Sequence, residues 1–349
     1  MTCLERVLTT LGHKEPDRVP FFLPLTMHGA RELGMSIREY YSRPENVAEA
    51  QVTMWKKWGD DFLFNFFYAA VETEAWGGQT VFFDDGPPNA GAPIVSHPEG
   101  IPHLQAPVVA EAPSLQRVLQ ATAIMRAQAG ADVPIIGVVM SPFSLPVMQL
   151  GFGPYLELLY ERRDLFERLM RLNEEFCVEW ANAQLAAGAT AIGYFDPVSS
   201  PTIIPYDLYV ATGLEVARRT IARIAGPTAT LMASGATIPI IDDVATTGTA
   251  ILGASCDEDL AEVKRLCKGR LTVIGNLNGI EMRRWTAAEA EAAVKDAIAR
   301  GGPGGGFVLS DTHGEIPWQV PDDVLYAIVD AVRTWGRYPL DWVQAEPEA

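Results

Sequence analysis

Three ionisable side chains follow the last apolar run of the chain. This run, Phe307–Ser310, is followed by Asp311, His313 and Glu315 at a spacing of two residues. Negative charge near an imidazole favours its protonated form, so we expect His313 to titrate near neutral pH. Such a histidine can act as an acid, a base or a metal ligand. Asp311, His313 and Glu315 are therefore candidate catalytic residues.

Polar or aromatic side chains also follow the earlier apolar runs. Asp196 comes directly after Phe195 and is the fourth candidate catalytic residue, with a turn cap at Pro197 as the alternative. The candidate substrate-binding residues occupy comparable positions: His28, Tyr68, Glu72, Phe143, Tyr194, Ser234, Asn276 and Trp318. Each has a structural alternative, as a surface histidine, a solvated helix residue, a loop-ordering side chain or a core aromatic. No serine lies in a GxSxG motif, which disfavours Ser/His/Asp nucleophilic chemistry.

Eight apolar runs have the length and composition of strands that are buried on both faces. They are Val19–Leu25, Phe62–Phe67, Ile135–Met140, Thr190–Phe195, Ala229–Ala233, Ala250–Ala254, Leu271–Gly275 and Phe307–Ser310. Amphipathic stretches between them predict helices, and Thr2 and Glu5 fit a capping box that begins an N-terminal helix. This alternation predicts an α/β fold, a single (β/α)8 TIM barrel over residues 1–349. The carboxyl ends of its strands would bring the polar side chains together.

Two segments depart from the strand and helix rhythm. Residues 76–113 are rich in Gly and Pro, and we expect them to form an excursion over the barrel mouth. Residues 340–349 are expected to fray as a tail. The glycine-rich segment Gly301–Gly306 follows a predicted helix and precedes a strand, which is the wrong order for a phosphate-binding loop. It is therefore interpreted as a connection.

The composition favours a cytoplasmic enzyme. A formal charge of -17, from 44 acidic and 27 basic residues, disfavours nonspecific contact with nucleic acid or an anionic membrane. The chain has no apolar run of membrane-spanning length, and charges interrupt the first apolar stretch, unlike in a signal peptide. None of the four cysteines forms a CxxC pair, which is typical of free thiols in a reducing compartment. The expected partners are a small molecule and another protein, and a homodimer is also compatible with the sequence.

Several segments resemble the uroporphyrinogen decarboxylase superfamily. They are ERVLTTLGHKEPDRVP at the start, SPFSL and YFDPVSSPTIIPYDLY in the middle, VIGNLNG, and LSDTHGEIPWQVPDDVL near the end. The resemblance covers nearly the whole chain and implies a barrel enzyme with one of two activities. One is cofactor-free decarboxylation of uroporphyrinogen, and the other is zinc-dependent methyl transfer to or from a corrinoid.

The match to the decarboxylases is partial. Their RQAGRY signature, which holds propionate groups, is replaced by TMHGARELG, where Arg31 is the only arginine. Their essential aspartate falls near Tyr68 and their tyrosine near Met148, whereas the histidine of their HG motif matches His313. Without the arginines, the site would lose its charge complement to a substrate with eight carboxylates.

The match to the methyltransferases is also partial. Their zinc ligands, an HxC motif and a distant cysteine, are replaced by Met232, Ser234 and His313. Serine and methionine are poor zinc ligands, so the usual zinc site is absent and any metal remains unknown. A site rebuilt from other side chains is the alternative, and its ligands would be His28, Asp196, His313 and Glu315.

The resemblance favours the methyltransferase side. We expect an enzyme that moves a methyl group from a small donor, such as a methoxylated aromatic compound, to a corrinoid. The chain has no DxHxxG segment, so the corrinoid would be carried by a partner protein and not bound by this chain. A protonated His313, oriented by Asp311 or Glu315, would protonate the leaving group. The alternatives are a decarboxylase of another acidic substrate, which uses His313 and Asp196, and a non-catalytic binding protein on the same barrel.

Overall fold

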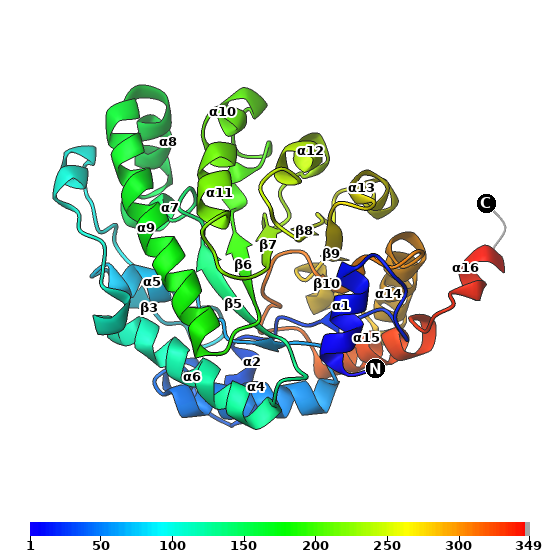
Figure 1. Cartoon of the computed structure of the whole chain (residues 1–349). Coiled ribbons are helices and arrows are strands. Elements are labelled where there is room, and N and C mark those ends of the chain that lie inside the picture. Colours follow the sequence, from blue (N-terminus) through cyan, green and yellow to red (C-terminus); the bar gives the residue numbers. More distant parts are fainter. Residues whose placement is uncertain (346–349) are drawn as a thin grey trace.

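A parallel sheet of eight strands forms the centre of the computed structural model, which describes residues 1–345. The strands lie in the order β1-β10-β9-β8-β7-β6-β5-β2, and they curl into a barrel with helices outside (Figure 1). The predicted fold class is therefore confirmed. The strand bounds are β1 Phe21–Phe22, β2 Leu63–Phe64, β5 Ile135–Met140, β6 Ala191–Phe195, β7 Thr228–Leu231, β8 Ile251–Gly253, β9 Thr272–Leu277 and β10 Phe307–Asp311.

The two strands at the ends of this order, β1 and β2, meet at a seam. One backbone bond crosses it, from the N–H of Asp61 to the carbonyl of Phe21 at 3.1 Å. Aromatic packing adds to the closure, since the ring of Phe22 lies 5.5 Å from that of Phe62 and 5.0 Å from that of Phe64. Side-chain packing thus completes the barrel where the strand ladder is short.

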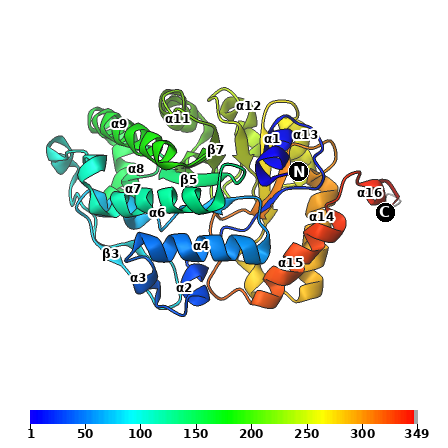
Figure 2. The same ribbon diagram turned by 60° about the horizontal axis from the view of Figure 1, so that its bottom comes forward.

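Helices surround the strands in both views of the chain (Figures 1 and 2). The helices that precede β6 are α1 Cys3–Leu11, α2 His28–Glu32, α3 Ile37–Tyr40, α4 Pro44–Trp58, α5 Ala70–Ala75, α6 Pro113–Ala129, α7 Pro146–Leu150, α8 Phe152–Glu161 and α9 Arg163–Ala187. Those that follow β6 are α10 Tyr206–Ala211, α11 Gly213–Ile221, α12 Ile241–Val244, α13 Leu260–Cys267, α14 Ala287–Gly301, α15 Asp322–Trp335 and α16 Asp341–Ala345. Short 3-10 helices cover Pro98–His103, Val109–Glu111, Pro197–Ser199, Ile238–Ile240 and Glu281–Arg284. None of the helices within residues 1–345 combines the length and hydropathy that crossing a bilayer requires.

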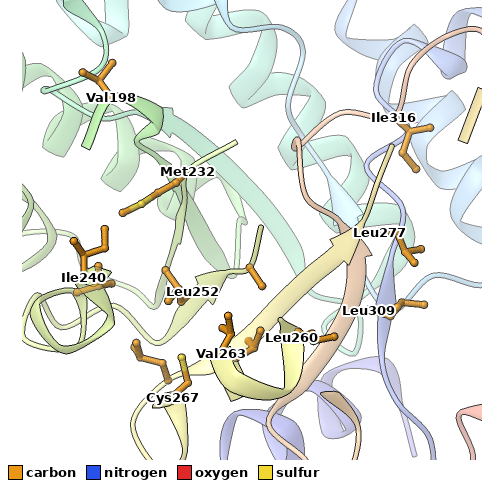
Figure 3. Close-up of a cluster of buried hydrophobic side chains, with 14 of the residues drawn as sticks. Val198, Met232, Ile240, Leu252, Leu260, Val263, Cys267, Leu277, Leu309 and Ile316 are labelled. Carbon is orange, nitrogen blue, oxygen red and sulfur yellow. The ribbon is translucent and has the colours of Figure 1, made fainter. Parts of the chain in front are cut away.

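The core has one part inside the barrel and two parts between the strands and the helices. The inner cluster contains Phe22, Phe64, Val138 and Val308, together with Val7 from α1. The predicted capping box at the start of α1 is present and holds this helix. Figure 3 shows part of one outer cluster, in which Leu252 of β8 and Val263 and Cys267 of α13 are buried. Burial on both faces explains why the strands consist of continuous apolar runs.

Residues 76–113 contain a small antiparallel pair, β3 (Thr80–Val81) and β4 (Asn89–Ala90). The carbonyl of Asp85 accepts a hydrogen bond from Gln319, in the loop after β10, at 2.8 Å. Further along, Glu99 pairs with Arg162 at the junction of α8 and α9. The segment thus reaches from the strand-tip loops to the outer helices. Its coverage of the barrel mouth stays a prediction.

The expectation of a frayed tail is wrong for its first part. Asp341–Ala345 form α16, visible near the C-terminus in Figure 1. The ring of Trp342 lies 5.3 Å from that of Trp335, and its indole N–H donates to the Trp335 carbonyl at 2.9 Å. Packing of the indole explains the order of this segment. Residues 346–349 of the predicted tail lie outside the described residues.

Candidate active site

A cavity inside the barrel reaches the carboxyl ends of the strands. Its walls are mainly apolar side chains such as Phe64, Ile136 and Ile274. Its polar lining comes from strand tips: Ser234, Ser310, Asp311 and Thr312. No lysine or arginine lines this central cavity among residues 1–345. It therefore suits a largely apolar, uncharged ligand.

The turn after β10 holds His313 against Asp311. The buried Asp311 carboxylate accepts the backbone N–H groups of His313 at 3.0 Å and Gly314 at 2.7 Å. Gly314 has a φ of 90°, which favours glycine. Asp311 Oδ2 also lies 3.3 Å from His313 Nδ1, while the imidazole keeps 22% exposure. With Nδ1–H directed at Asp311, the other ring nitrogen remains available for a ligand.

Glu315 lies apart from this pair. Its carboxylate accepts a hydrogen bond from the hydroxyl of Thr26, after β1. Desolvation raises the pKa of Glu315 to about 7, and the nearby negative charge of Asp311 acts in the same direction. Of the two carboxylates expected to orient His313, Asp311 is therefore the one in contact with it, and Glu315 is a separate group that titrates near neutrality.

A second group of polar side chains spans the tips of β7, β8 and β9. We call Ser234, Ser255, Cys256 and Asn276 the polar arc. Ser234 Oγ lies 3.1 Å from Ser255 Oγ and 3.4 Å from Cys256 Sγ, and the Asn276 amide donates to the Ser255 carbonyl at 3.1 Å. Ser255 and Cys256 were not among the candidates, although both directly follow a predicted strand. Their position directly after a predicted strand is the sequence signal that could have identified them.

Asp196 is buried beside β5 and is absent from the lining of the central cavity. Its Oδ1 accepts hydrogen bonds from Ser141 at 2.5 Å and Ser144 at 2.7 Å. Burial raises the pKa of Asp196, while the serine hydroxyls act in the opposite direction. Its contacts link the tips of β5 and β6, and its catalytic role stays a prediction.

We expect Asp196→Ala to lower the free energy of unfolding by about 1–3 kcal/mol, because two buried serine hydroxyls lose their acceptor. Urea unfolding measures this effect. Asp196→Asn is the matched control, since it keeps an acceptor oxygen and removes the charge. Wild-type stability of the alanine variant would contradict the proposed structural contribution. A wild-type turnover rate of the asparagine variant would argue against a catalytic charge at this position.

Glu72, on α5, is also buried, and its Oε1 accepts the backbone N–H of Met140 at 2.9 Å. Because β2 pairs only with Ile135 and Ile136 of β5, the Glu72 carboxylate provides a hydrogen-bond acceptor for the backbone N–H at the end of β5. Burial raises the pKa of Glu72 from 4.5 to about 8. Its side chain does not line the central cavity, so its substrate-binding role stays a prediction.

The raised pKa of Glu72 predicts how the stability of the protein depends on pH. Between about pH 4.5 and pH 8 the folded state keeps the Glu72 proton that the unfolded chain has released, so stability falls as pH rises. Glu72→Gln should remove a loss of a few kcal/mol over this window. Thermal unfolding across the window measures the difference from wild type, with Glu74→Gln as the control on the same helix. Equal pH slopes for wild type and Glu72→Gln would contradict the prediction.

Three predicted aromatic contacts lie outside the central cavity. Phe143 packs against Tyr155 and Phe166, at ring distances of 5.9 and 6.1 Å, in the outer core. Tyr194 and Tyr68 belong to the other outer cluster. Phe195, one position after Tyr194, reaches the inner cluster because successive side chains of a strand face opposite sides, and it also contacts the outer cluster that contains Tyr194. The substrate-binding roles of Phe143, Tyr194 and Tyr68 stay predictions.

The ring centroids of His28, at the start of α2, and Trp318, in the loop after β10, lie 6.0 Å apart. His28 lines a second cavity between α2, α4 and α15, where Arg31, Lys57 and Asp322 are also found. Burial, with a smaller effect from Arg31, lowers the pKa of His28 to about 3. The imidazole is therefore neutral at physiological pH and unsuited to donate a proton as imidazolium. Its role in substrate binding stays a prediction.

The donor set for zinc does not come together. Within residues 1–345 no three His, Cys, Asp or Glu side chains form a group that could hold a metal ion. Of the alternative ligands, Asp196 is bonded to serines and Glu315 to Thr26, while His28 lines the second cavity. These residues do not fit a zinc ion as they stand.

Comparison with known proteins gives a consistent picture. The family described as Uroporphyrinogen decarboxylase (URO-D) matches residues 2–335. Methylcobamide:CoM methyltransferase MtaA of Methanosarcina barkeri is 27% identical over 289 residues, or 79% of this chain and 83% of the relative. A uroporphyrinogen decarboxylase of Xylella fastidiosa is 25% identical over 358 residues, which cover 95% of this chain and 99% of the relative. The solved structure of a methyltransferase from Methanosarcina mazei shares the fold, with a TM-score of 0.84 and 22% identity over 96% of this chain and 99% of that one.

Proposed function

Because the chain belongs to the uroporphyrinogen decarboxylase family, we propose that it is a methyltransferase which moves a methyl group from a small donor to a corrinoid. The corrinoid would be carried by a partner protein that docks at the barrel mouth. The family also contains decarboxylases, so the choice between the two activities depends on the chemistry of the central cavity.

The absence of cationic side chains from this cavity carries the proposal. No lysine or arginine of residues 1–345 lines it. Arg31 is the only arginine in the segment that replaces the arginine signature of the decarboxylases. It lies 4.5 Å above the ring of Trp318 and lines the second cavity. A polycarboxylate substrate would enter an apolar space without counter-charges, which is strongly unfavourable. A small uncharged methyl ether or similar donor fits the same space.

His313 supplies the acid for this reaction. When the methyl group leaves an ether oxygen, the bonding electron pair stays on that oxygen, which must then be protonated. A corrinoid on the partner protein would supply the electron pair of the new bond to carbon. His313 is not itself a lining residue, but it lies between Thr312 and Gly314, which both line the central cavity. Held by Asp311, it would donate the proton from its free ring nitrogen at the edge of this cavity, and the apolar walls would exclude competing water. Such general acid catalysis typically contributes about 100- to 10,000-fold.

A decarboxylase of a less charged acid is the second candidate. The similarity to a decarboxylase along 95% of the chain favours it, as does Glu315, whose pKa of about 7 allows it to donate a proton to a carbanion. This reaction would use the carboxyl group on the β1 side of the site instead of His313.

Product analysis separates the two candidates. The purified protein is incubated with uroporphyrinogen and a pool of monocarboxylic and dicarboxylic acids and, separately, with reduced cobalamin and a pool of methoxyaromatic and methylamine donors. We expect chromatography to detect a demethylated product in the second mixture and intact carboxyl groups in the first. Loss of carboxyl groups without any demethylation would replace the proposal by the decarboxylase.

A further inference from the structure

The turn after β7 holds two consecutive non-glycine residues in the left-handed region. Ala233 has a φ of 47° and Ser234 a φ of 65°. A non-glycine residue in this region is strained, and it persists only where its surroundings fix the backbone. Here the surroundings are tight, because a Cβ at the following Gly235 would approach Ser200 Oγ to 2.6 Å. The result of this strained turn is that Ser234 lines the central cavity.

The hydrogen bonds of the polar arc leave one site unused on Ser234. Ser255 Oγ donates to the Ser234 carbonyl at 2.9 Å and accepts the N–H of Asp257 at 3.2 Å, so its own proton is engaged. Ser234 is then the donor to Ser255 Oγ at 3.1 Å. Burial raises the pKa of Cys256, which remains a thiol with one proton. Its Sγ lies 3.4 Å from Ser234 Oγ and donates to Asp257 Oδ1 at 3.8 Å, so Cys256 occupies at most one acceptor position of Ser234. A hydroxyl oxygen accepts two bonds, so Ser234 keeps one acceptor position.

The charges around the cavity determine which ligand group can fill that position. The central cavity has no lysine or arginine lining among residues 1–345, and the buried carboxylate of Asp311 lines it from β10, three strands from β7. A ligand carboxylate would be unpaired there and would have no proton to give to Ser234. A neutral hydroxyl is a donor, adds no charge and matches the unused position.

We propose that the polar arc is a specificity site in which Ser234 accepts a hydrogen bond from an uncharged hydroxyl group of the substrate. The donors selected in this way are hydroxyl-bearing methyl ethers, such as methoxyphenols, in preference to methoxybenzoates. The aromatic ring would lie against apolar walls such as Phe64 and Ile274. The assignment of these ligands as methyl donors rests on the proposed function, whereas their binding preference does not.

Binding measurements test the proposal without requiring turnover. Isothermal titration of the full chain compares the three methoxyphenol isomers with methoxybenzene and 2-methoxybenzoate. One buried hydrogen bond corresponds to about a tenfold gain, so at least one methoxyphenol should bind about tenfold more tightly than methoxybenzene. The benzoate should bind most weakly. Ser234→Ala, which keeps a Cβ in the same strained turn, should abolish the preference for the hydroxyl group.

Ser310→Ala is the matched comparison, because it removes another serine hydroxyl that lines the cavity from β10. We expect it to retain the preference for methoxyphenol. Equal binding of methoxyphenols and methoxybenzene, no binding of any compound, or a preference that survives in Ser234→Ala would each overturn the inference. If the preference depends on Ser234 but no methyl group is transferred, the proposed function fails while the specificity site stands.

Discussion

Replacing His313 with alanine should lower the rate of methyl transfer by about 100- to 10,000-fold, the usual contribution of a general acid. The leaving oxygen would then have to take its proton from water, which the apolar walls of the central cavity disfavour. The imidazole contacts the Asp311 carboxylate and keeps partial exposure, so its loss should leave the fold intact. Single-turnover kinetics with the methyl donor measures the effect.

Two further variants make the His313 result interpretable. Asp311→Asn keeps an acceptor oxygen for one of the two backbone N–H groups of the turn and weakens the contact with the imidazole, so it should show a smaller loss than His313→Ala. Glu315→Gln alters the neighbouring carboxyl, which does not contact His313, and it serves as the control for local charge. Wild-type rates for His313→Ala, with unfolding midpoints also unchanged, would refute the acid role.

Replacing Asp61 with alanine should destabilise the protein by about 3–5 kcal/mol, the usual cost of breaking a buried ion pair. The Asp61 carboxylate has no exposed surface and pairs with Arg6 at 2.6 Å and Arg18 at 2.7 Å. It also accepts the backbone N–H of Phe21 at 2.9 Å, at the seam between β1 and β2. Its removal leaves two largely buried guanidinium groups without this partner and weakens the barrel closure. Urea unfolding measures the loss.

Asp17 offers a matched control for this prediction. It also pairs with Arg6 at 2.6 Å, but its side chain is 41% exposed. Exposed pairs contribute about 0–1 kcal/mol, so Asp17→Ala should have a much smaller effect than Asp61→Ala. Similar losses for the two variants would show that burial at the seam does not govern the stability of this cluster.

The strands were predictable because burial on both faces leaves a continuous apolar signal. Ile135–Met140 has the predicted bounds, and the closing motif correctly located the turn of Asp311 and His313 after β10. A continuous apolar run, however, does not show which side chains face inward. The sequence predicts Tyr194 as a substrate-binding residue, but Tyr194 belongs to an outer cluster, whereas Phe195 reaches the inner cluster. Direction depends on the pleat and on register with neighbouring strands, which a single run does not encode.

Contacts between different strand tips were harder to predict. Nothing in the sequence links Ser234 to Cys256, which are brought together by the pairing of β7 with β8 and by the left-handed turn at Ala233. Likewise, the position of His28 after β1 indicated a site residue. The helix that starts there instead carries its ring to the second cavity, where burial keeps it neutral.

Anaerobic spectroscopy tests the central claim most directly. The protein is mixed with Co(I) cobalamin and a methoxyphenol, and the absorption bands of Co(I) and methyl-Co(III) are followed, with His313→Ala in parallel. The account predicts conversion to methyl-Co(III) that depends on the protein and is lost in the variant. Conversion no faster than in the protein-free control, with both free cobalamin and a corrinoid protein as acceptor, would contradict methyl transfer by this barrel.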